Sequence, residues 1–190
     1  MPDAALFATF IHLLGVVGVA GSSTTFILVL SLMRRARDTR DVRLWSGLGT
    51  FAESAFPFAT LVLLISGGYL VQKESYSWRD GWISFSAIAL VLMAVAALKI
   101  NTLKMNAIHH AAEEAPDGAV PPVLAAQAAD PVLFAVTHAI TTTQLGIIWN
   151  MTTKPGDLQA GVAIVLAALI GAASAAPMVA RQRRLIAGES

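Results

Sequence analysis

Residues 7–33 read FATFIHLLGVVGVAGSSTTFILVLSLM, and this stretch decides the fold class. It contains no Asp, Glu, Lys or Arg. It also exceeds the roughly 20 mostly apolar residues that a helix needs to cross a bilayer. Stretches of this kind lie at about 5–33, 51–71, 81–98, 131–151 and 160–179. Backbone groups in lipid must be hydrogen-bonded within the protein, and the alternation typical of a membrane barrel is missing. We therefore expect an all-α membrane protein, a bundle of five transmembrane helices.

The composition agrees with a membrane protein. Hydrophobic residues make up 56% of the 190 residues, charged residues only 13%, and the mean hydropathy is +0.66. Soluble domains carry about 25% charged residues. The five stretches use nearly the whole chain, so we expect residues 1–190 to form a single transmembrane domain. The chain has no cysteine, which excludes disulfides, thiolate metal sites and c-type haem attachment.

The basic residues are distributed unevenly around the expected spans. Ten of the 13 lie on one side: Arg34, Arg35, Arg37, Arg40, Arg43, Lys99, Lys104, Arg181, Arg183 and Arg184. Only Lys73, Arg79 and Lys154 lie on the other. Because cytoplasmic loops carry the excess of Lys and Arg, we expect the N-terminus outside and the C-terminus in the cytoplasm. The predicted location is a bacterial-type inner (plasma) membrane, crossed several times. The first cytoplasmic loop has no interleaved aromatic residues, so it does not indicate a nucleic-acid partner.

His12 is a titratable residue inside the first span, and such residues are functional-site hypotheses by default. Gly15, Gly18 and Ser22 form a strip of small residues along one edge of the same helical side. The strip could admit a flat cofactor or another helix close to the backbone. A neutral imidazole is a good ligand for haem iron, copper or zinc. The alternative is a histidine hydrogen-bonded to a neighbouring helix, with glycines that serve only packing.

Glu53, Lys99 and His138 form a second candidate group. All three fall in the inner half of the second, third and fourth spans, where opposite charges could pair and offset the cost of burial. Such a group could conduct protons or bind an anion facing the cytoplasm. The alternative is a buried polar network, or a Lys99 side chain that extends to the inner interface. His12 lies in the opposite half of the bilayer, so His12 and His138 are not expected to ligate one haem together.

The connections and the last span carry further signals. Residues 34–44 are expected to be a cytoplasmic loop, and residues 109–130, with Pro116, Gly118 and Pro121, an irregular cytoplasmic connection. In the fifth span, Ala167, Gly171 and Ala175 repeat every four positions. This spacing favours close helix packing within the bundle, in a homo-oligomer or in a larger membrane complex. Aromatic residues near the outer loops are expected to form an interfacial belt: Tyr69, Tyr76, Trp78, Trp82 and Trp149.

Several short motifs resemble a known superfamily. They are His12 in a first span closed by basic residues, the segment LISGGYL at 64–70 followed by Gly81-Trp82, and Thr153-Lys154-Pro155 after the fourth span. This set resembles the HemJ-type protoporphyrinogen oxidases, the CopD-like proteins and their uncharacterised membrane relatives. The resemblance implies a b-type haem ligated by His12 and redox or haem-related chemistry. The HemJ-type enzymes have a lysine shortly after Gly-Trp. Residues 83–86 read ISFS here, so the uncharacterised branch is the nearer match.

Two functional hypotheses follow. The first is a membrane protein that binds haem b through His12, beside Gly15 and Gly18, and acts in electron transfer, haem handling or a small redox reaction. The second is a transporter or channel for a small solute, metal ion or proton, with an accessory subunit of a larger complex as a further alternative. No catalytic residue is assigned, and the sequence leaves open whether the protein is an enzyme.

Overall fold

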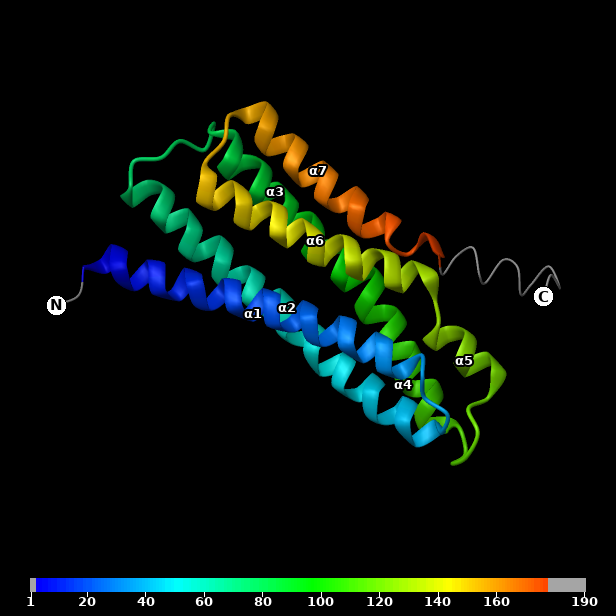
Figure 1. Ribbon diagram of the computed structural model, residues 1–190. Coiled ribbons are helices and arrows are strands. Elements are labelled where there is room, and N and C mark those ends of the chain that lie inside the picture. The colour runs from blue at the N-terminus through cyan, green and yellow to red at the C-terminus, as the bar shows by residue number, and fades with distance from the viewer. Residues whose placement is uncertain (1–2, 178–190) are drawn as a thin grey trace.

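The computed structural model describes residues 3–177, which form a bundle of helices (Figure 1). The elements are α1 (Ala4–Met33), α2 (Thr39–Lys73), α3 (Gly81–Ala96), the π-helix η1 (Ala97–Thr102), α4 (Leu103–Glu114), α5 (Pro122–Ala128), α6 (Pro131–Thr153) and α7 (Asp157–Ala173). Among these residues the only β-type pairing is an isolated bridge between Asp38 and Ala119. The expectation of an all-α protein is confirmed.

Four helical segments are long and apolar enough to cross a membrane. They are Ala4–Met33, Thr39–Lys73, Gly81–Glu114 and Pro122–Thr153. The last helix, α7, is apolar but has 17 residues, which correspond to about 25 Å of helix. Five helices thus match the expected spans roughly, four of them at full spanning length. Arg181, Arg183 and Arg184, and the end of the expected fifth span at 178–179, lie outside the described residues.

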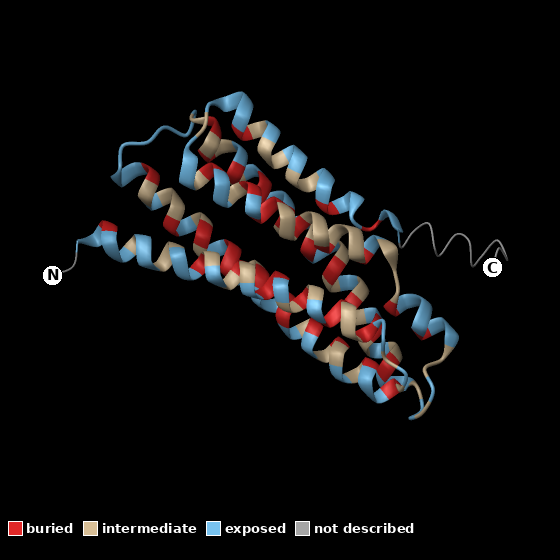
Figure 2. Cartoon of the chain, viewed as in Figure 1, coloured by how far each residue is buried: buried red, intermediate tan, exposed pale blue. Residues whose placement is uncertain are grey.

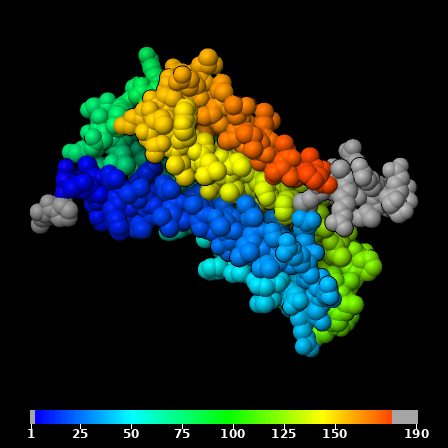
Figure 3. All heavy atoms as spheres, viewed as in Figure 1, coloured from blue at the N-terminus to red at the C-terminus, as the bar shows by residue number. Residues whose placement is uncertain are grey.

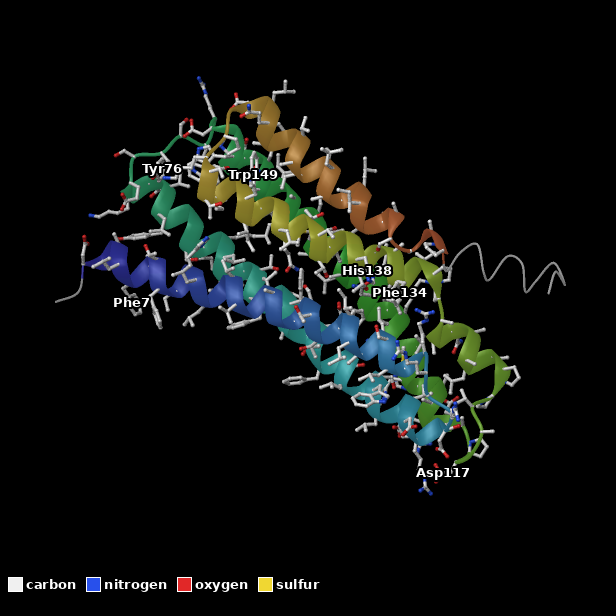
Figure 4. The ribbon with its side chains drawn as sticks, viewed as in Figure 1. Phe7, Tyr76, Asp117, Phe134, His138 and Trp149 are labelled. Atoms are coloured by element: carbon white, nitrogen blue, oxygen red, sulfur yellow. The ribbon has the colours of Figure 1, made fainter. Side chains whose placement is uncertain are left out.

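The helices form two groups. α1 packs along α2, and α6 packs against α3 and α7 (Figure 1). The space-filling view shows α7 lying along α6 (Figure 3). The groups meet near the middle of the bundle, where an apolar cluster includes Val19, Phe56, Met93 and Ile140. We name the two ends of the bundle after a residue at each. The Lys154 end holds the start of α1 and Tyr76, which Lys154 contacts, and the Asp117 end holds the α4–α5 connection; Figure 4 labels Phe7 and Tyr76 at the first end and Asp117 at the second.

The outer surfaces of these helices are strongly apolar. Exposed fractions reach 71% for Phe58, 68% for Val17 and 60% for Leu169. Figure 2 shows the buried residues along the helix seams and the exposed ones on the outward faces. An apolar surface of this extent is a liability in water and suits contact with lipid chains. The fold is therefore that of a protein embedded in a bilayer.

The connections at the Asp117 end are shorter than expected. α2 begins at Thr39 rather than near residue 51, and the third helix continues to Glu114. The expected loop 34–44 is therefore corrected to residues 34–38. The expected irregular connection 109–130 is corrected to two short segments, 115–121 and 129–130, on either side of α5. The cause is a second apolar cluster, because it gives the added turns a surface to pack on. It includes Phe26, Met33, Val42, Met105, Ile108, Leu124 and Leu133.

Ion pairs join α2 to the loop after α4 at this end of the bundle. Arg40 donates to Asp117 from Nε at 2.9 Å and from Nη2 at 2.8 Å, and Arg43 donates to the other carboxylate oxygen at 3.2 Å. The hydrogen bonds from Arg40 and Arg43 hold the pKa of the Asp117 carboxyl below its usual range. The backbone N–H of Thr39 also donates to the Gly118 carbonyl at 2.8 Å. The start of α2 is thereby fastened to the loop after α4.

The small residues of α7 face its own bundle. A Cβ on Gly171 would lie 2.4 Å from the carbonyl oxygen of His138, and a Cβ on Gly146 would lie 3.2 Å from the Cβ of Ala167. The hydroxyl of Thr142 also donates to the Ala167 carbonyl at 2.7 Å. The strip therefore provides close packing of α7 on α6. Packing against a second protomer or another subunit stays a prediction.

Candidate functional site

His12 lies half-buried on α1, and its ring makes a defined hydrogen bond with α2. Its Nδ1 is 3.0 Å from Oγ of Ser66. The same hydroxyl lies 2.6 Å from the Val62 carbonyl, to which it can only donate. When its proton is on that carbonyl, the Ser66 oxygen accepts from Nδ1–H of His12. In that tautomer Nε2 carries the lone pair through which histidine binds metals.

A glycine on α2 makes space for this ring. A Cβ built on Gly67 would lie 3.2 Å from Cε1 and 3.5 Å from Nδ1 of His12. The imidazole therefore rests against the backbone of α2. Sequence reasoning missed Ser66 and Gly67 as partners of His12, although both lie in the LISGGYL motif. The motif drew attention to this part of the second span, but the sequence did not show that it faces His12 of the first span.

The glycines near His12 pack against α2. A Cβ on Gly15 would lie 2.9 Å from side-chain atoms of Leu63, and a Cβ on Gly18 would lie 2.9 Å from the Cβ of Ala59. Ser22, the third member of the strip, donates to the carbonyl of Ala52. Of the two occupants considered for this strip, the structure places a helix there. Any flat cofactor at His12 has to approach from another side.

The structure does not gather Glu53, Lys99 and His138 into one group. Glu53 is buried and pairs with Asn101, whose Nδ2 donates to Oε1 at 3.4 Å. Lys99 is exposed on η1. His138 donates from Nδ1 to the Phe134 carbonyl at 2.9 Å and stacks on the Phe134 ring at a centroid distance of 4.4 Å (Figure 4). Each of the three thus has a different environment.

The reason lies in the helical register of the third span. Met93, Ala97 and Asn101 are spaced by four residues and are all buried, so they share the face that packs into the bundle. Lys99 is two positions from both Ala97 and Asn101, about 200° around the helix axis, which turns it outward. Sequence reasoning did not pair Asn101 with Glu53, because the charge of Lys99 gave the stronger signal.

Two of the motif segments meet at the Lys154 end. The backbone N–H of Gly81 donates to Asp157 at 2.8 Å, which joins the start of α3 to the start of α7. The ammonium of Lys154 donates to the hydroxyl of Tyr76 and lies 5.4 Å from the centre of the Trp82 ring. Tyr76 and Trp82 meet edge to face at 5.2 Å. Gly-Trp and Lys-Pro therefore form one structural junction, with Tyr76 and Trp149 at the same end (Figure 4).

In the part of the chain that the structure describes, no group of three or more His, Cys, Asp or Glu residues could hold a metal ion. A cluster of protein ligands around His12 is thus not available in that part. The ligand chemistry that His12 offers is a single imidazole nitrogen held in place by a serine. This arrangement suits a cofactor that brings most of its own coordination sphere, as a porphyrin does.

Comparison with known families identifies the family of this chain. Residues 6–155 match the family described as "Predicted integral membrane protein (DUF2269)". The chain belongs to this family. Neither the curated proteins nor the solved structures contain a match. The matched region includes His12, Ser66, Glu53, Asn101 and Lys154, whereas α7 begins after it. The family supports an integral membrane protein and leaves its activity to be proposed.

Proposed function

We propose that this integral membrane protein binds haem b through Nε2 of His12. The observation that carries the proposal is the contact of Nδ1 with Ser66, whose hydroxyl also reaches the Val62 carbonyl; the tautomer with its proton on Nδ1 satisfies both contacts and offers Nε2 to a metal. Metal-binding histidines are commonly held in this way by a partner on the other ring nitrogen. The resemblance of the His12, LISGGYL and Gly-Trp motifs to haem-related membrane proteins supports the same ligand.

The residues around His12 fit a haem in part. An imidazole with a free nitrogen and a chain without cysteine suit a non-covalently bound b-type haem. Gly15 and Gly18 are removed from the proposed site, because Leu63 and Ala59 cover them. When bound, a haem supplies one-electron chemistry, which would serve electron transfer, haem handling or a small redox reaction. His12 would hold the iron, and Ser66 would orient the ring.

The absorption spectrum of purified protein tests the proposal. The protein is expressed with a haem precursor and purified in detergent, and we expect a Soret band that is lost in His12→Ala. We expect Ser66→Ala to weaken haem binding by about 10–100-fold, the usual effect of losing such a partner. The matched control is His110→Ala, because His110 is exposed. Wild-type protein without a Soret band, or a band that survives in His12→Ala, would refute the proposal.

We also propose that the Lys154 end faces the outside and the Asp117 end the cytoplasm of a bacterial-type inner membrane. The uneven distribution of basic residues supports this orientation. The chain has no cysteine, so single cysteines report topology directly. In intact cells we expect an impermeant thiol reagent to label Ser77→Cys, and to label Glu114→Cys only after permeabilisation. Both positions are exposed. The reverse pattern would overturn the orientation.

A further inference from the structure

A second site lies between α2 and η1, near the middle of the bundle. Glu53 is 5% exposed and Asn101 is 1% exposed. The Asn101 amide donates to one oxygen of the carboxyl, and the Thr102 hydroxyl also interacts with the carboxyl, but no donor reaches Oε2 of Glu53 or Oδ1 of Asn101 with hydrogen-bond geometry. Buried polar atoms are nearly always paired, so two orphans in adjacent side chains need an explanation.

The orphaned atoms are both acceptors. An ionised carboxylate has no proton to donate, and the amide oxygen has none either. An ionised, unpaired carboxylate in so buried a place is very unfavourable. A single proton on Oε2 removes both deficits, since Oε2–H then donates to Oδ1 of Asn101 while the amide N–H donates to Oε1. We propose that Glu53 and Asn101 form a proton-binding site, in which the proton closes a ring of two hydrogen bonds.

No charged group in the described part of the chain takes the place of that proton. α3 has no titratable residue, and Lys99 of η1 is exposed. The remaining titratable groups on α1, α4 and α6 that are not exposed have other partners: His12 with Ser66, Lys104 with Asp130, His109 with Ser46, and His138 with the Phe134 carbonyl. His110, Glu113 and Glu114 of α4 are exposed.

The backbone is irregular on both sides of this pair. Asn101 lies in the π-helix, a geometry that is rare and often found at functional sites. On α2, Pro57 has no N–H, so the carbonyl of Glu53 lacks its usual helical donor four residues on. These two departures from regular helix flank the same two side chains. Their position indicates a built site rather than a chance meeting of polar residues.

Infrared spectroscopy tests the proposal on the wild-type protein. A protonated carboxyl has a C=O stretch above the amide bands, separate from that of a carboxylate. At neutral pH we expect one such band, shifted by isotope labelling of glutamate and absent from Glu53→Gln. The matched control is Glu113→Gln, which should keep the band. Wild-type protein without this band at neutral pH would overturn the proposal.

Thermal unfolding distinguishes a proton from a metal cation. In Glu53→Gln the new amide N–H replaces the proton of the carboxyl, so we expect an unchanged Tm, whereas Glu53→Leu and Asn101→Leu should lower it. The wild-type Tm should be the same in sodium chloride and in choline chloride. A Tm that rises with sodium and no longer does so in Glu53→Gln would assign the site to a cation and refute the proton.

Discussion

The contact between α6 and α7 allows a sharp test of the packing. In Gly171→Ala the new Cβ would lie 2.1 Å from Oγ1 of Thr142 and 2.4 Å from the carbonyl oxygen of His138. The carbonyl belongs to the backbone of α6, so it cannot move aside as a flexible side chain can. Either α7 shifts away or the Thr142 hydroxyl is displaced, and displacement breaks its bond to the Ala167 carbonyl.

The expected magnitude follows from three contributions. Overpacking of a tight contact costs about 1–3 kcal/mol, and loss of one hydrogen bond costs about 0.5–1.5 kcal/mol. Alanine is a better helix former than glycine by about 1 kcal/mol, which offsets part of the loss. We therefore expect Gly171→Ala to lower the free energy of unfolding by about 0.5–3.5 kcal/mol.

Gly21→Ala is the matched control. The chemical change is the same, but a Cβ on Gly21 meets no atom within 4 Å and the residue is exposed on α1. We expect this variant to be more stable than wild type by up to about 1 kcal/mol. The assay is unfolding in detergent micelles, followed by circular dichroism. Equal shifts of Tm in the two variants, or a Gly171→Ala protein as stable as wild type, would refute the packing.

Three further predictions concern the two ends of the bundle and the histidine. The depressed pKa of Asp117 stabilises the loop around it above pH about 4, and this contribution is lost as the pH falls through the lower folded-state pKa. The protection factors of the loop amides, which are exchange rates corrected for the intrinsic pH dependence, should fall on acidification in wild type and stay constant in Asp117→Asn. Lys154→Met should lower the free energy of unfolding by about 0.5–1 kcal/mol, because the variant loses the cation–π contacts of the ammonium with the rings of Tyr76 and Trp82, whereas Lys73→Met, at an exposed position, should have no effect. Gly67→Ala should displace the His12 ring and weaken haem binding by about ten-fold or more in a titration with haem; unchanged affinity would separate this glycine from the proposed site.

The helices could be predicted from the sequence because apolar length is a property of each segment by itself. Their ends could not. The first turns of α2 and the extension to Glu114 are stabilised by contacts of Val42, Met105 and Ile108 at the Asp117 end, and those contacts exist only in the folded bundle. Local propensity around residues 34–44 gave no sign of them, because the arginines there resemble an ordinary cytoplasmic loop.

The candidate sites were predictable to the extent that one residue was unusual by itself. His12 and Glu53 are titratable residues in apolar segments, so the sequence identified both. Their partners, Ser66 and Asn101, are uncharged, and small polar residues occur often in membrane helices. To find them requires the register between helices, which no single segment encodes. Lys99 and Asn101 are only two residues apart on the third span, so the sequence alone favoured the charged Lys99 as the partner of Glu53.

One helix carries part of each proposed site. Ser66 of α2 orients His12, and Glu53 of α2 pairs with Asn101, with 13 residues or about 20 Å of helix between them. Pro57 lies between the two and interrupts the backbone hydrogen bonding of α2. The sites are therefore separate in ligand and in position, and Glu53→Gln should leave the Soret band intact. If the band did change, α2 would have to transmit the difference past Pro57, and the two sites would be parts of one proton-coupled redox device.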